Sequence, residues 1–497
     1  MRGEVLEPRT PHPEPAPGGV SRLAINTLAP MAARVIDAAF ALVYLRVLGL
    51  AGTGSYQQVV VLTTYLDTLI DFGLNALLAR DVPRSPGAAG AAFRAVALVR
   101  LGLWLVGLPL VALIYGPGRD MAGVPADAAL AGGLFYLGLL PTVLAKTATG
   151  LLWAFERLEL PAGVSVVATV FKTGLGVLVL ASGFGLVGLA ASSLLVNLVT
   201  AGALLVLLAR VFPRHRPPSP APRSIGWVRE AWPLFVNQLL QGLFFKVDAV
   251  LLPPLAGATA AGAYAAAYKV GEGAGIISSS FTLALFPRLS READLARAYR
   301  LALRVLLQLA FPLATDIAIL AEHVVAVVGG RAFLPDAAIA LAILIWYLPL
   351  SFANGLTQYV LIAAGRQRFL TAAFLAAFIF NVAANLVLIP RFGFVGAALI
   401  TVASELVLLI PFRWAAERAA PGASLVREAR RPIVATLLMA PVVWWLRDAL
   451  HPLVAVAAGS LVYPISLWAV GGIDADEWSA IRRLLAFGAR RPRPATY

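Results

Sequence analysis

The chain has 497 residues, of which 13% are charged and 60% are hydrophobic, and its mean hydropathy is +0.83. Soluble domains are about 25% charged and about 45–50% apolar, so this composition excludes a soluble enzyme and predicts a protein that lies mostly in a membrane. The absence of cysteine excludes disulfide frameworks, thiolate metal sites and cysteine nucleophiles. We expect no metal site, because the four histidines lie in separate segments without ligand spacing: His12, His215, His323 and His451. We also expect no cofactor, because no phosphate-loop or dinucleotide motif falls in a soluble segment.

Apolar stretches of about 20 residues, each long enough to cross a bilayer, follow one another along most of the chain. Five prolines interrupt residues 1–21, so we expect a disordered tail there and not a signal peptide. The pattern predicts an all-α integral membrane protein with about fourteen transmembrane helices. The expected spans are 23–48, 56–80, 93–116, 128–153, 160–182, 186–209, 230–253, 260–286, 300–325, 336–363, 369–389, 394–415, 432–449 and 453–471.

Basic residues are unevenly divided between the two sides of the expected membrane. The tails and loops on the amino-terminal side, with the adjoining helix ends, hold 28 lysines and arginines, whereas the other side holds four: Arg119, Arg331, Arg391 and Arg447. Cytoplasmic loops are enriched in Lys and Arg, so both termini are placed in the cytoplasm. The net charge of +14 is then mainly a consequence of topology, and we expect no nucleic-acid partner because the arginines form no single patch.

A repeat with an offset of 208 residues relates the two halves of the chain. The clearest matches are Gly54 and Tyr56 with Gly262 and Tyr264, and FGLVGLA at 184–190 with FGFVGAA at 392–398. Each half contains six spans, an even number, so both halves enter the membrane in the same sense. The repeat therefore predicts two pseudo-symmetric six-helix lobes around a central cavity, with two extra helices at the C-terminus.

This pattern divides the chain into six expected segments. Prolines and arginines crowd the connection between the lobes, and the last segment places apolar residues on one side of a helix and arginines on the other. The segments are 1–21, a disordered cytoplasmic tail; 22–209, the N-lobe; 210–229, a cytoplasmic linker; 230–415, the C-lobe; 416–471, helices 13 and 14; and 472–497, a basic amphipathic cytoplasmic tail.

All four lysines fall inside expected spans, although the loops use arginine: Lys146, Lys172, Lys246 and Lys269. A charge at the centre of a membrane costs about 2.5–3.5 kcal/mol on insertion scales, so such groups normally face a cavity or a partner. Three arginines near span ends are expected to snorkel to the interface, as Lys246 could also do: Arg46, Arg100 and Arg304. The deepest basic residues are Arg34, Lys172 and Lys269.

Polar residues form stripes on several expected helices. On the second helix the stripe is Thr64, Asp67, Asp71 and Asn75. Two carboxylates four residues apart on one face repel each other, so we expect either a compensating cation or a bound proton. The repeat places Glu272, Gly275 and Ser279, with Lys269 and Thr282, on the matching helix; the first helix adds Asn26, Arg34 and Asp37, and the seventh adds Asn237, Gln241 and Asp248.

Two interpretations of these stripes stay open. They face each other across a central cavity, or the pairs Arg34 with Asp37 and Lys269 with Glu272 are i,i+3 ion pairs that only hold helices together. Asp316 and Glu405 are single acids in their helices, for which packing is the simpler role.

The segment 44–80, YLRVLGLAGTGSYQQVVVLTTYLDTLIDFGLNALLAR, resembles the second-helix signature of polysaccharide transporters, in which a Gly-x-Tyr opening precedes an Asp-x-Gly-Leu segment. GAYAAAYKVGEGAGIISSSFTLALFPRLS at 262–290 resembles the matching signature of the second lobe. FGLVGLA and FGFVGAA resemble the loops before helices 6 and 12. The chain is thus similar to the oligosaccharide-lipid (O-antigen type) flippases of the multidrug/oligosaccharidyl-lipid/polysaccharide exporter superfamily.

This resemblance implies a transporter, not an enzyme, that moves a polyprenyl-pyrophosphate-linked oligosaccharide to the outer leaflet of a bacterial inner membrane by alternating access, for surface polysaccharide biosynthesis. Besides the cargo, it implies contact with membrane lipids and with the polysaccharide polymerase machinery. A pyrophosphate needs cations, so the expected substrate-binding residues are Arg34, Lys172, Lys269, Asn237 and Gln241. The expected cavity acids, or coupling residues for H+ or Na+, are Asp37, Asp67, Asp71, Asp248 and Glu272.

Three alternatives are weighed against this hypothesis. A cation-coupled multidrug exporter of the same superfamily typically has twelve helices and an acidic cavity, whereas this chain has fourteen expected spans and buried lysines. A peptidoglycan lipid-precursor flippase resembles the chain in span number, but its first-helix charge pattern is matched only by Arg34 and Asp37. A non-transporting scaffold would leave the polar stripes unexplained.

Overall fold

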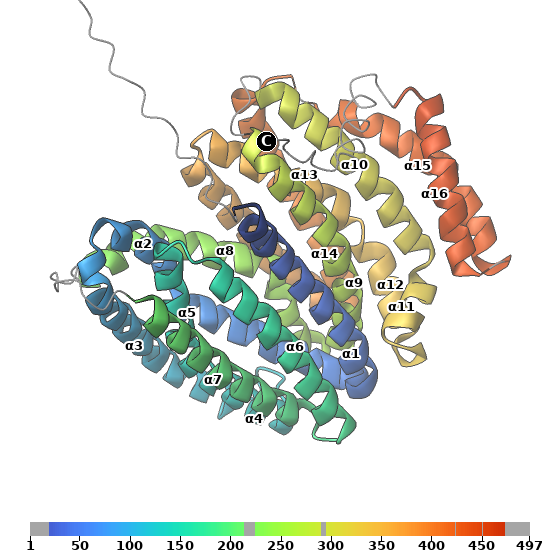
Figure 1. Ribbon diagram of the computed structural model, residues 1–497. Helices are drawn as coiled ribbons and strands as arrows, with labels where there is room; N and C mark the ends of the chain where they lie inside the picture. Colours follow the sequence, from blue (N-terminus) through green and yellow to red (C-terminus); the bar gives the residue numbers. More distant parts are fainter. Residues whose placement is uncertain (1–18, 213–223, 290–294, 423, 450, 473–497) are drawn as a thin grey trace, which may run out of the picture.

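The computed structural model describes residues 19–212, 224–289, 295–422, 424–449 and 451–472, and this part of the chain consists of helices and short turns (Figure 1). The protein is a multi-pass, all-helical membrane protein. Within the described ranges, ten helices are long and apolar enough to cross a membrane, or eleven if the bent pair α12 and α13 forms one span. Apolar side chains cover the outside: Trp445 is 75% exposed and Ile410 is 71% exposed, as expected for surfaces that face hydrocarbon.

The first half of the chain contains seven α-helices and two short 3-10 turns. They are α1 Gly19–Asp71, α2 Leu74–Asp81, η1 Val82–Arg84, η2 Pro86–Ala88, α3 Ala89–Tyr115, α4 Ala126–Leu137, α5 Leu139–Ala154, α6 Glu159–Ala181 and α7 Gly185–Val211. α1 has a non-helical residue at Gly49, so its 53 residues carry the first expected span and most of the second.

The second half repeats this order and adds two helices. Its elements are α8 Ser224–Ala256, α9 Ala258–Leu289, α10 Leu295–Ile319, α11 Ala321–Val328, η3 Arg331–Phe333, α12 Asp336–Leu344, α13 Tyr347–Ala363, α14 Gln367–Ala419, α15 Leu425–Ala449 and α16 Pro452–Ala469. Like α1, α14 is broken at a glycine, Gly393, and holds two expected spans. The two broken helices are one reason why candidate spans number fewer than the expected fourteen.

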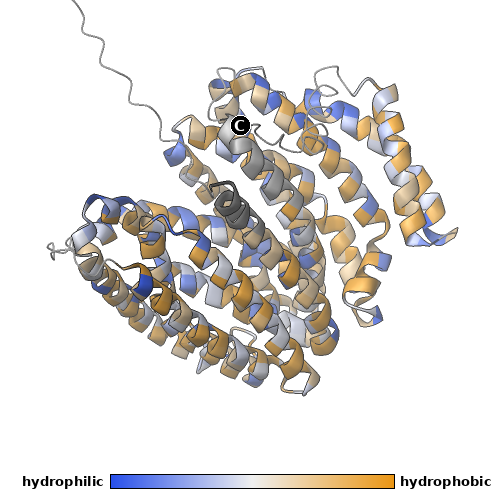
Figure 2. Ribbon diagram, in the orientation of Figure 1, coloured by the Kyte–Doolittle hydropathy of each residue, from blue (hydrophilic) through white to orange (hydrophobic). Residues whose placement is uncertain are grey.

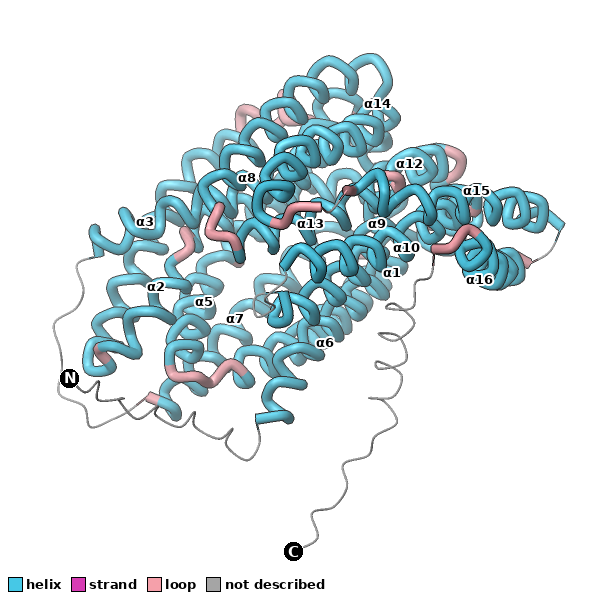
Figure 3. The backbone as a smooth tube through the Cα atoms, turned by 90° about the horizontal axis from the view of Figure 1, so that it is seen from above, coloured by secondary structure: helices cyan, strands magenta, loops and turns pink. Residues whose placement is uncertain are grey.

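The backbone breaks recur with the offset of 208 residues. Gly49 and Gly257 have φ of 66° and 88°, and Gly185 and Gly393 have φ of 53° and 55°. Glycine is the residue that adopts positive φ without strain, so equivalent turns of the two halves use equivalent glycines. The break between α4 and α5 likewise has a counterpart between α12 and α13, where the two helices are bent by 41°. α15 and α16 have no counterpart, and they lie at one edge of the molecule beyond α10 (Figures 1 and 3).

One contact between the halves is formed by backbone. A Cβ on Gly54 of α1 would overlap the carbonyl oxygen of Ala258, and a Cβ on Gly262 of α9 would overlap the carbonyl oxygen of Leu50. These four residues are two repeat-related pairs, so the contact is reciprocal, as at the interface of a symmetric dimer. It therefore marks the place where the local pseudo-twofold axis passes between α1 and α9.

At the other end of the membrane the halves meet through side chains. The first part of α8 packs on the N-terminal half, where the ring of Phe235 stacks on Phe72 with centroids 4.5 Å apart. Arg80 forms an ion pair of 2.6 Å with Glu230, and both side chains are about half exposed. Gly54 and Arg80 are separated by 26 residues of nearly continuous helix, roughly 40 Å at 1.5 Å per residue.

Several expectations lie outside the described residues. They include the tail up to residue 18, the centre of the linker at 213–223, the amphipathic segment after 472 and the side chains of Asn26, Ser279 and Thr282.

Polar residues of the described helices gather near helix ends, including those of α2 and α10 (Figure 2). α15 begins at Leu425 and not at residue 432, so its first two turns carry arginines that were expected in a loop.

Gly54→Ala and Gly262→Ala are expected to destabilise the protein by about 1–3 kcal/mol, because the added methyl groups would meet backbone atoms that cannot move aside. Gly102→Ala in α3 is the matched control, since a Cβ there meets nothing within 4 Å. The melting temperature in detergent, followed by tryptophan fluorescence, should fall by several degrees for the first two variants only. Equal melting temperatures for all three would disprove the close approach.

Candidate functional site

A cluster of charged residues from three helices lies inside the N-terminal half. Asp67 and Asp71 come from the second arm of α1, Arg100 from α3 and Lys146 from α5. Lys146 Nζ lies 2.8 Å from Asp67 Oδ2 and 3.8 Å from Asp71 Oδ1, and an Arg100 Nη lies 2.8 Å from Asp71 Oδ1. Two cations thus compensate the two carboxylates, which is the first of the two solutions expected for this pair.

The position of Arg100 in the structure shows that the expectation of a side chain snorkelling to the membrane interface was wrong. Its side chain is fully buried and donates to Thr147 Oγ1 at 2.9 Å and to Asn75 Oδ1 at 3.0 Å, besides its ion pair with Asp71. Its place in the sequence suggested that Arg100 lies at the end of a membrane span, where water could solvate it. Instead, hydrogen-bond acceptors on three helices replace the water that the guanidinium group would otherwise need. Sequence analysis missed the role of this residue; the weak signal was that no other charged residue follows it in α3, which continues to Tyr115.

A second cluster lies in the C-terminal half. Lys246 of α8 and Lys269 of α9 share the carboxylate of Glu272, at 2.8 Å and 3.0 Å. The i,i+3 pair between Lys269 and Glu272 therefore exists, but it is only part of a three-residue arrangement with one positive charge in excess. Lys246 is about one third exposed and pairs across helices, so it is not a simple interfacial lysine.

The deep residues of α1 and α6 are placed differently. Arg34 and Asp37 are both exposed. Lys172 on α6 is half-buried and forms no hydrogen bond or ion pair with the described residues.

A chain of amides connects α8 to α13. Gln241 Nε2 donates to Asn237 Oδ1 at 3.1 Å, and Gln358 Nε2 donates to Gln241 Oε1 at 3.3 Å. The three side chains are half-buried, so their remaining donors and acceptors suit hydroxyl-rich ligands. Gln358 was not identified from the sequence, although Asn354 four residues earlier on the same helix was the signal that could have marked it.

Two buried carboxylates of the second half are held by neutral donors. Asp248 accepts hydrogen bonds from the Tyr264 hydroxyl, from Thr401 Oγ1 at 3.2 Å and from the Ala249 amide at 2.8 Å. Glu405, one turn after Thr401 on α14, accepts from Asn354 Nδ2 at 2.6 Å. Neither has a lysine or arginine partner within ion-pair distance among the described residues.

The first half does not repeat this pair of acids. An offset of 208 places Phe40 opposite Asp248 and Asn197 opposite Glu405. Asn197 instead donates to the carbonyl of Gly138 at 3.1 Å. The halves thus share a backbone plan but differ in chemistry: the first contains balanced ion pairs, and the second contains an excess lysine and two carboxylates without cations.

The fold is shared with solved transporters. The chain superposes on the lipid II flippase MurJ in an inward closed conformation with a TM-score of 0.74 and 14% identity, covering 89% of this chain and 97% of that one. An inward-facing MATE family multidrug resistance transporter of the MOP superfamily gives 0.64 and 17%, covering 80% and 98%. A MOP superfamily transporter from Pyrococcus furiosus gives 0.57 and 16%, covering 80% and 95%. At these identities the likeness establishes the fold.

The sequence itself identifies the family. None of the curated proteins matches the chain significantly. The family model described as polysaccharide biosynthesis protein matches residues 21–292, more than half of the chain and including both charged clusters. The chain therefore belongs to the polysaccharide biosynthesis protein family, a family of membrane transporters and not of enzymes.

Proposed function

We propose that the protein flips a polyprenyl-pyrophosphate-linked oligosaccharide from the cytoplasmic to the outer leaflet of a bacterial inner membrane, for surface polysaccharide biosynthesis. The observation that carries this proposal is the pair of lysines, Lys246 on α8 and Lys269 on α9, around the single carboxylate of Glu272. An uncompensated positive charge in a membrane is expensive and calls for an anionic partner. A pyrophosphate supplies that charge.

The proposed mechanism is alternating access by two six-helix lobes, 22–209 and 230–415, which fourteen spans and cytoplasmic termini would place around a central cavity. The reciprocal glycine contact and the side-chain contact of Arg80 with Glu230 lie at opposite ends of the membrane. An exposed ion pair contributes about 0–1 kcal/mol, and the stacked rings of Phe72 and Phe235 are side chains that can separate without a change in the backbone, so the arginine-rich end is the one that we expect to open. The lobes would then rock about the end that contains Gly54 and Gly262.

The cargo-binding residues follow from the charges. Lys269 and Lys246 would bind the pyrophosphate, with Lys172 and Arg34 on the facing lobe, and Asn237 and Gln241 would hydrogen-bond to saccharide hydroxyl groups. Asp67 and Asp71 are already paired with Lys146 and Arg100. Their role in this proposal is to hold those cations in place.

Coupling to H+ or Na+ is assigned to Asp248. A carboxylate surrounded by hydroxyl and amide groups gains a counter-charge when it binds a proton or Na+, and its hydrogen bonds reach both α9 and α14. The other two candidate coupling carboxylates are Asp37, which is exposed, and Glu272. Their surroundings would change when the two lobes move relative to each other. Contacts with the polymerase machinery would use the loops outside the membrane.

A peptidoglycan lipid-precursor flippase is the second candidate, favoured by the superposition on the lipid II flippase over 89% of this chain. Its cargo is also a lipid-linked saccharide, so both candidates use the same cationic sites. A multidrug exporter is disfavoured by the positive charge excess at Glu272.

Depletion of the protein in its host tests the proposal. Mass spectrometry of extracted polyprenyl lipids should show accumulation of one saccharide-linked pyrophosphate lipid together with loss of a surface polysaccharide. Accumulation of the peptidoglycan precursor would favour the second candidate. An unchanged lipid pool would contradict both.

Lys269→Gln is expected to slow flipping at least about tenfold, because a charge-assisted contact to the pyrophosphate is lost. The double variant Lys269→Gln/Glu272→Gln restores the single excess positive charge, now carried by Lys246, and so distinguishes direct contact from net charge. If Lys269 itself contacts the cargo, the double variant stays defective, whereas a lysine that acts only through the net charge of the cluster would allow recovery to wild-type rates. The readout is the rate of cargo exposure in reconstituted vesicles at equal protein levels, and recovery would refute the role given to Lys269.

Asp248→Asn is expected to remove the dependence of transport on an imposed ion gradient while slow passive equilibration persists, because the amide cannot bind a proton or a cation in the same way. Asp127→Asn, an exposed acid in the first turn of α4, is the matched control. Transport by both variants is compared with and without a proton or sodium gradient. Retention of full gradient stimulation by Asp248→Asn would rule out the coupling role.

A further inference from the structure

Asp316 is a carboxyl group in an apolar part of α10, and it belongs to neither of the two charged clusters. Its Oδ1 atom is buried and has no hydrogen-bond partner, and no basic residue of the described ranges forms an ion pair with it. An ionisable residue inside a membrane normally has a partner or a function. Because Asp316 lacks a partner in the described part of the chain, holding helices together through an ion pair is not its role.

The carboxyl group lies where α10, α15 and α16 converge. A Cβ on Gly459 of α16 would come within 3.2 Å of Asp316 Oδ1, 2.8 Å of Val443 Cγ2 and 3.6 Å of Met439 Sδ. The missing side chain at Gly459 therefore leaves the room that the carboxyl group needs between α10 and α16. Its neighbours at this point are apolar side chains and the backbone of α16.

Three hydroxyl groups on the same stretch of these helices are also buried without hydrogen-bond partners in the described chain. Thr315 precedes Asp316 on α10, Thr436 lies one turn before Met439 on α15, and Tyr463 lies one turn after Gly459 on α16. Their exposed fractions are 5%, 5% and 8%. Hydroxyl groups are neutral and do not compensate a carboxylate, whereas they are suitable neighbours for a carboxylic acid, which both donates and accepts.

Charged and titratable groups on the surrounding helices do not neutralise Asp316. None of them forms a hydrogen bond or ion pair with it within the described ranges, and Arg447 instead lies 2.9 Å from Asp448 and stacks on Trp444. A buried carboxyl group in such surroundings favours its neutral, protonated form. The groups on the neighbouring elements are Lys269 and Glu272 on α9, Glu322 and His323 on α11, Asp336 on α12, Tyr347 on α13, Arg447 and Asp448 on α15, and His451 and Tyr463 at the start and in the middle of α16.

The acid is specific to the half of the protein that carries the two added helices. The offset of 208 residues places Leu108 of α3 at the position equivalent to Asp316. Leu108 is 38% exposed, because the described first half has no counterpart of α15 and α16 to cover it. An apolar residue thus occupies the uncovered position, and an acid occupies the covered one.

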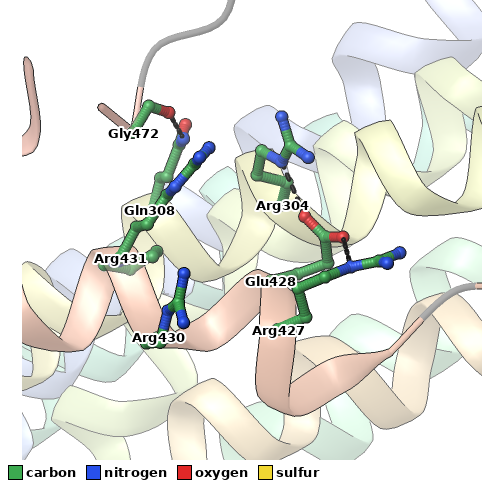
Figure 4. Close-up of a pocket in the computed structure, with 8 residues that line it drawn as sticks. Arg304, Gln308, Arg427, Glu428, Arg430, Arg431 and Gly472 are labelled. Carbon is green, nitrogen blue, oxygen red and sulfur yellow. Dashed lines mark hydrogen bonds and ion pairs between the residues drawn. The ribbon is translucent and has the colours of Figure 1, made fainter. Parts of the chain in front are cut away.

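The same three helices are joined differently at the arginine-rich end of the membrane. Arg304 Nε of α10 lies 2.7 Å from Glu428 Oε2 of α15, and Gln308 Nε2 donates to the carbonyl of Gly472 at 3.0 Å (Figure 4). Gly472 follows the end of α16. Polar contacts therefore connect α15 and the end of α16 to α10 at that end, whereas at Asp316 the contact depends on the charge state of one carboxyl group.

We propose that Asp316 is a proton-binding site that is occupied while α15 and α16 are docked on α10. The proton comes from the aqueous phase and neutralises the carboxylate. Its release leaves a negative charge buried among three helices, which loosens α16 from α10 while the contacts at the arginine-rich end persist. The two added helices are thus a proton-controlled cover on the C-terminal half, whichever cargo the protein carries.

Modification by dicyclohexylcarbodiimide tests for the bound proton in the wild-type protein. This apolar reagent reacts with protonated carboxyl groups, and peptide mass spectrometry of the full-length protein in detergent identifies the modified residue. Asp316 should be modified at neutral pH, and its modification should fall about tenfold for each pH unit above the midpoint of its titration. Glu322, an exposed acid in the first turn of α11, should stay unmodified at neutral pH.

Two results of this experiment would overturn the proposal. One is the absence of modification at Asp316 at both neutral and mildly acidic pH. The other is suppression of the modification by sodium ions at constant pH, because the site would then hold a metal cation and not a proton.

Hydrogen exchange of segment 452–469 tests the link between the proton and docking. Asp316→Asn keeps the shape of the neutral acid but cannot release a proton. The docked state binds one more proton than the loosened state, so its stability falls as the pH rises. At mildly acidic pH the wild type and Asp316→Asn should exchange at equal rates, and at alkaline pH the wild type should exchange at least about tenfold faster than the variant.

Glu322→Gln is the matched control for this comparison, and it should follow the wild type at every pH. Each comparison is made at one pH, so the intrinsic pH dependence of exchange cancels. Equal exchange of the wild type and Asp316→Asn at alkaline pH would overturn the proposal.

Discussion

The close approach of α1 and α9 is the constraint on which the arrangement of the two halves depends. Gly54 and Gly262 allow the backbones of the two helices to touch. Gly54 faces the carbonyl oxygen of Ala258, and Gly262 faces that of the equivalent residue, Leu50. Any larger side chain would force the helices apart at this end, so the pseudo-twofold axis is fixed locally. At the opposite end the halves meet through stacked rings and an exposed ion pair. This difference between the two ends suits a transporter whose lobes rock.

Chemical asymmetry is built on this symmetric backbone. In the first half, Arg100 and Lys146 balance Asp67 and Asp71. In the second half the lysines outnumber their carboxylate, while Asp248 and Glu405 are held by neutral donors. Because the two halves carry different charges, the proposal can assign different roles to different groups. The lysines around Glu272 attract the anionic cargo, and Asp248 responds to the coupling ion. The proposed division of labour between cargo binding and coupling rests on this asymmetry.

Much of the fold was predictable from the sequence, because hydropathy locates membrane helices and the offset of 208 residues locates equivalent turns. The partners of the charged residues were not. Arg100 was assigned to the interface because its acceptors, Asp71 and Thr147, lie on other helices, and Lys246 meets Glu272 only once α8 packs on α9. Spacing along one helix did predict the contact of Lys269 with Glu272. Contacts within a helix follow from periodicity, whereas those between helices depend on packing that hydropathy does not encode.

The most direct test of the central claim is a flipping assay with purified protein in liposomes. A polyprenyl-pyrophosphate-linked saccharide is placed in one leaflet, and its appearance in the other is followed with an impermeant reagent that modifies the sugar. The account predicts protein-dependent exposure much faster than in protein-free vesicles. Exposure at the protein-free rate, with a correctly folded and inserted protein and an imposed ion gradient of either kind, would contradict it.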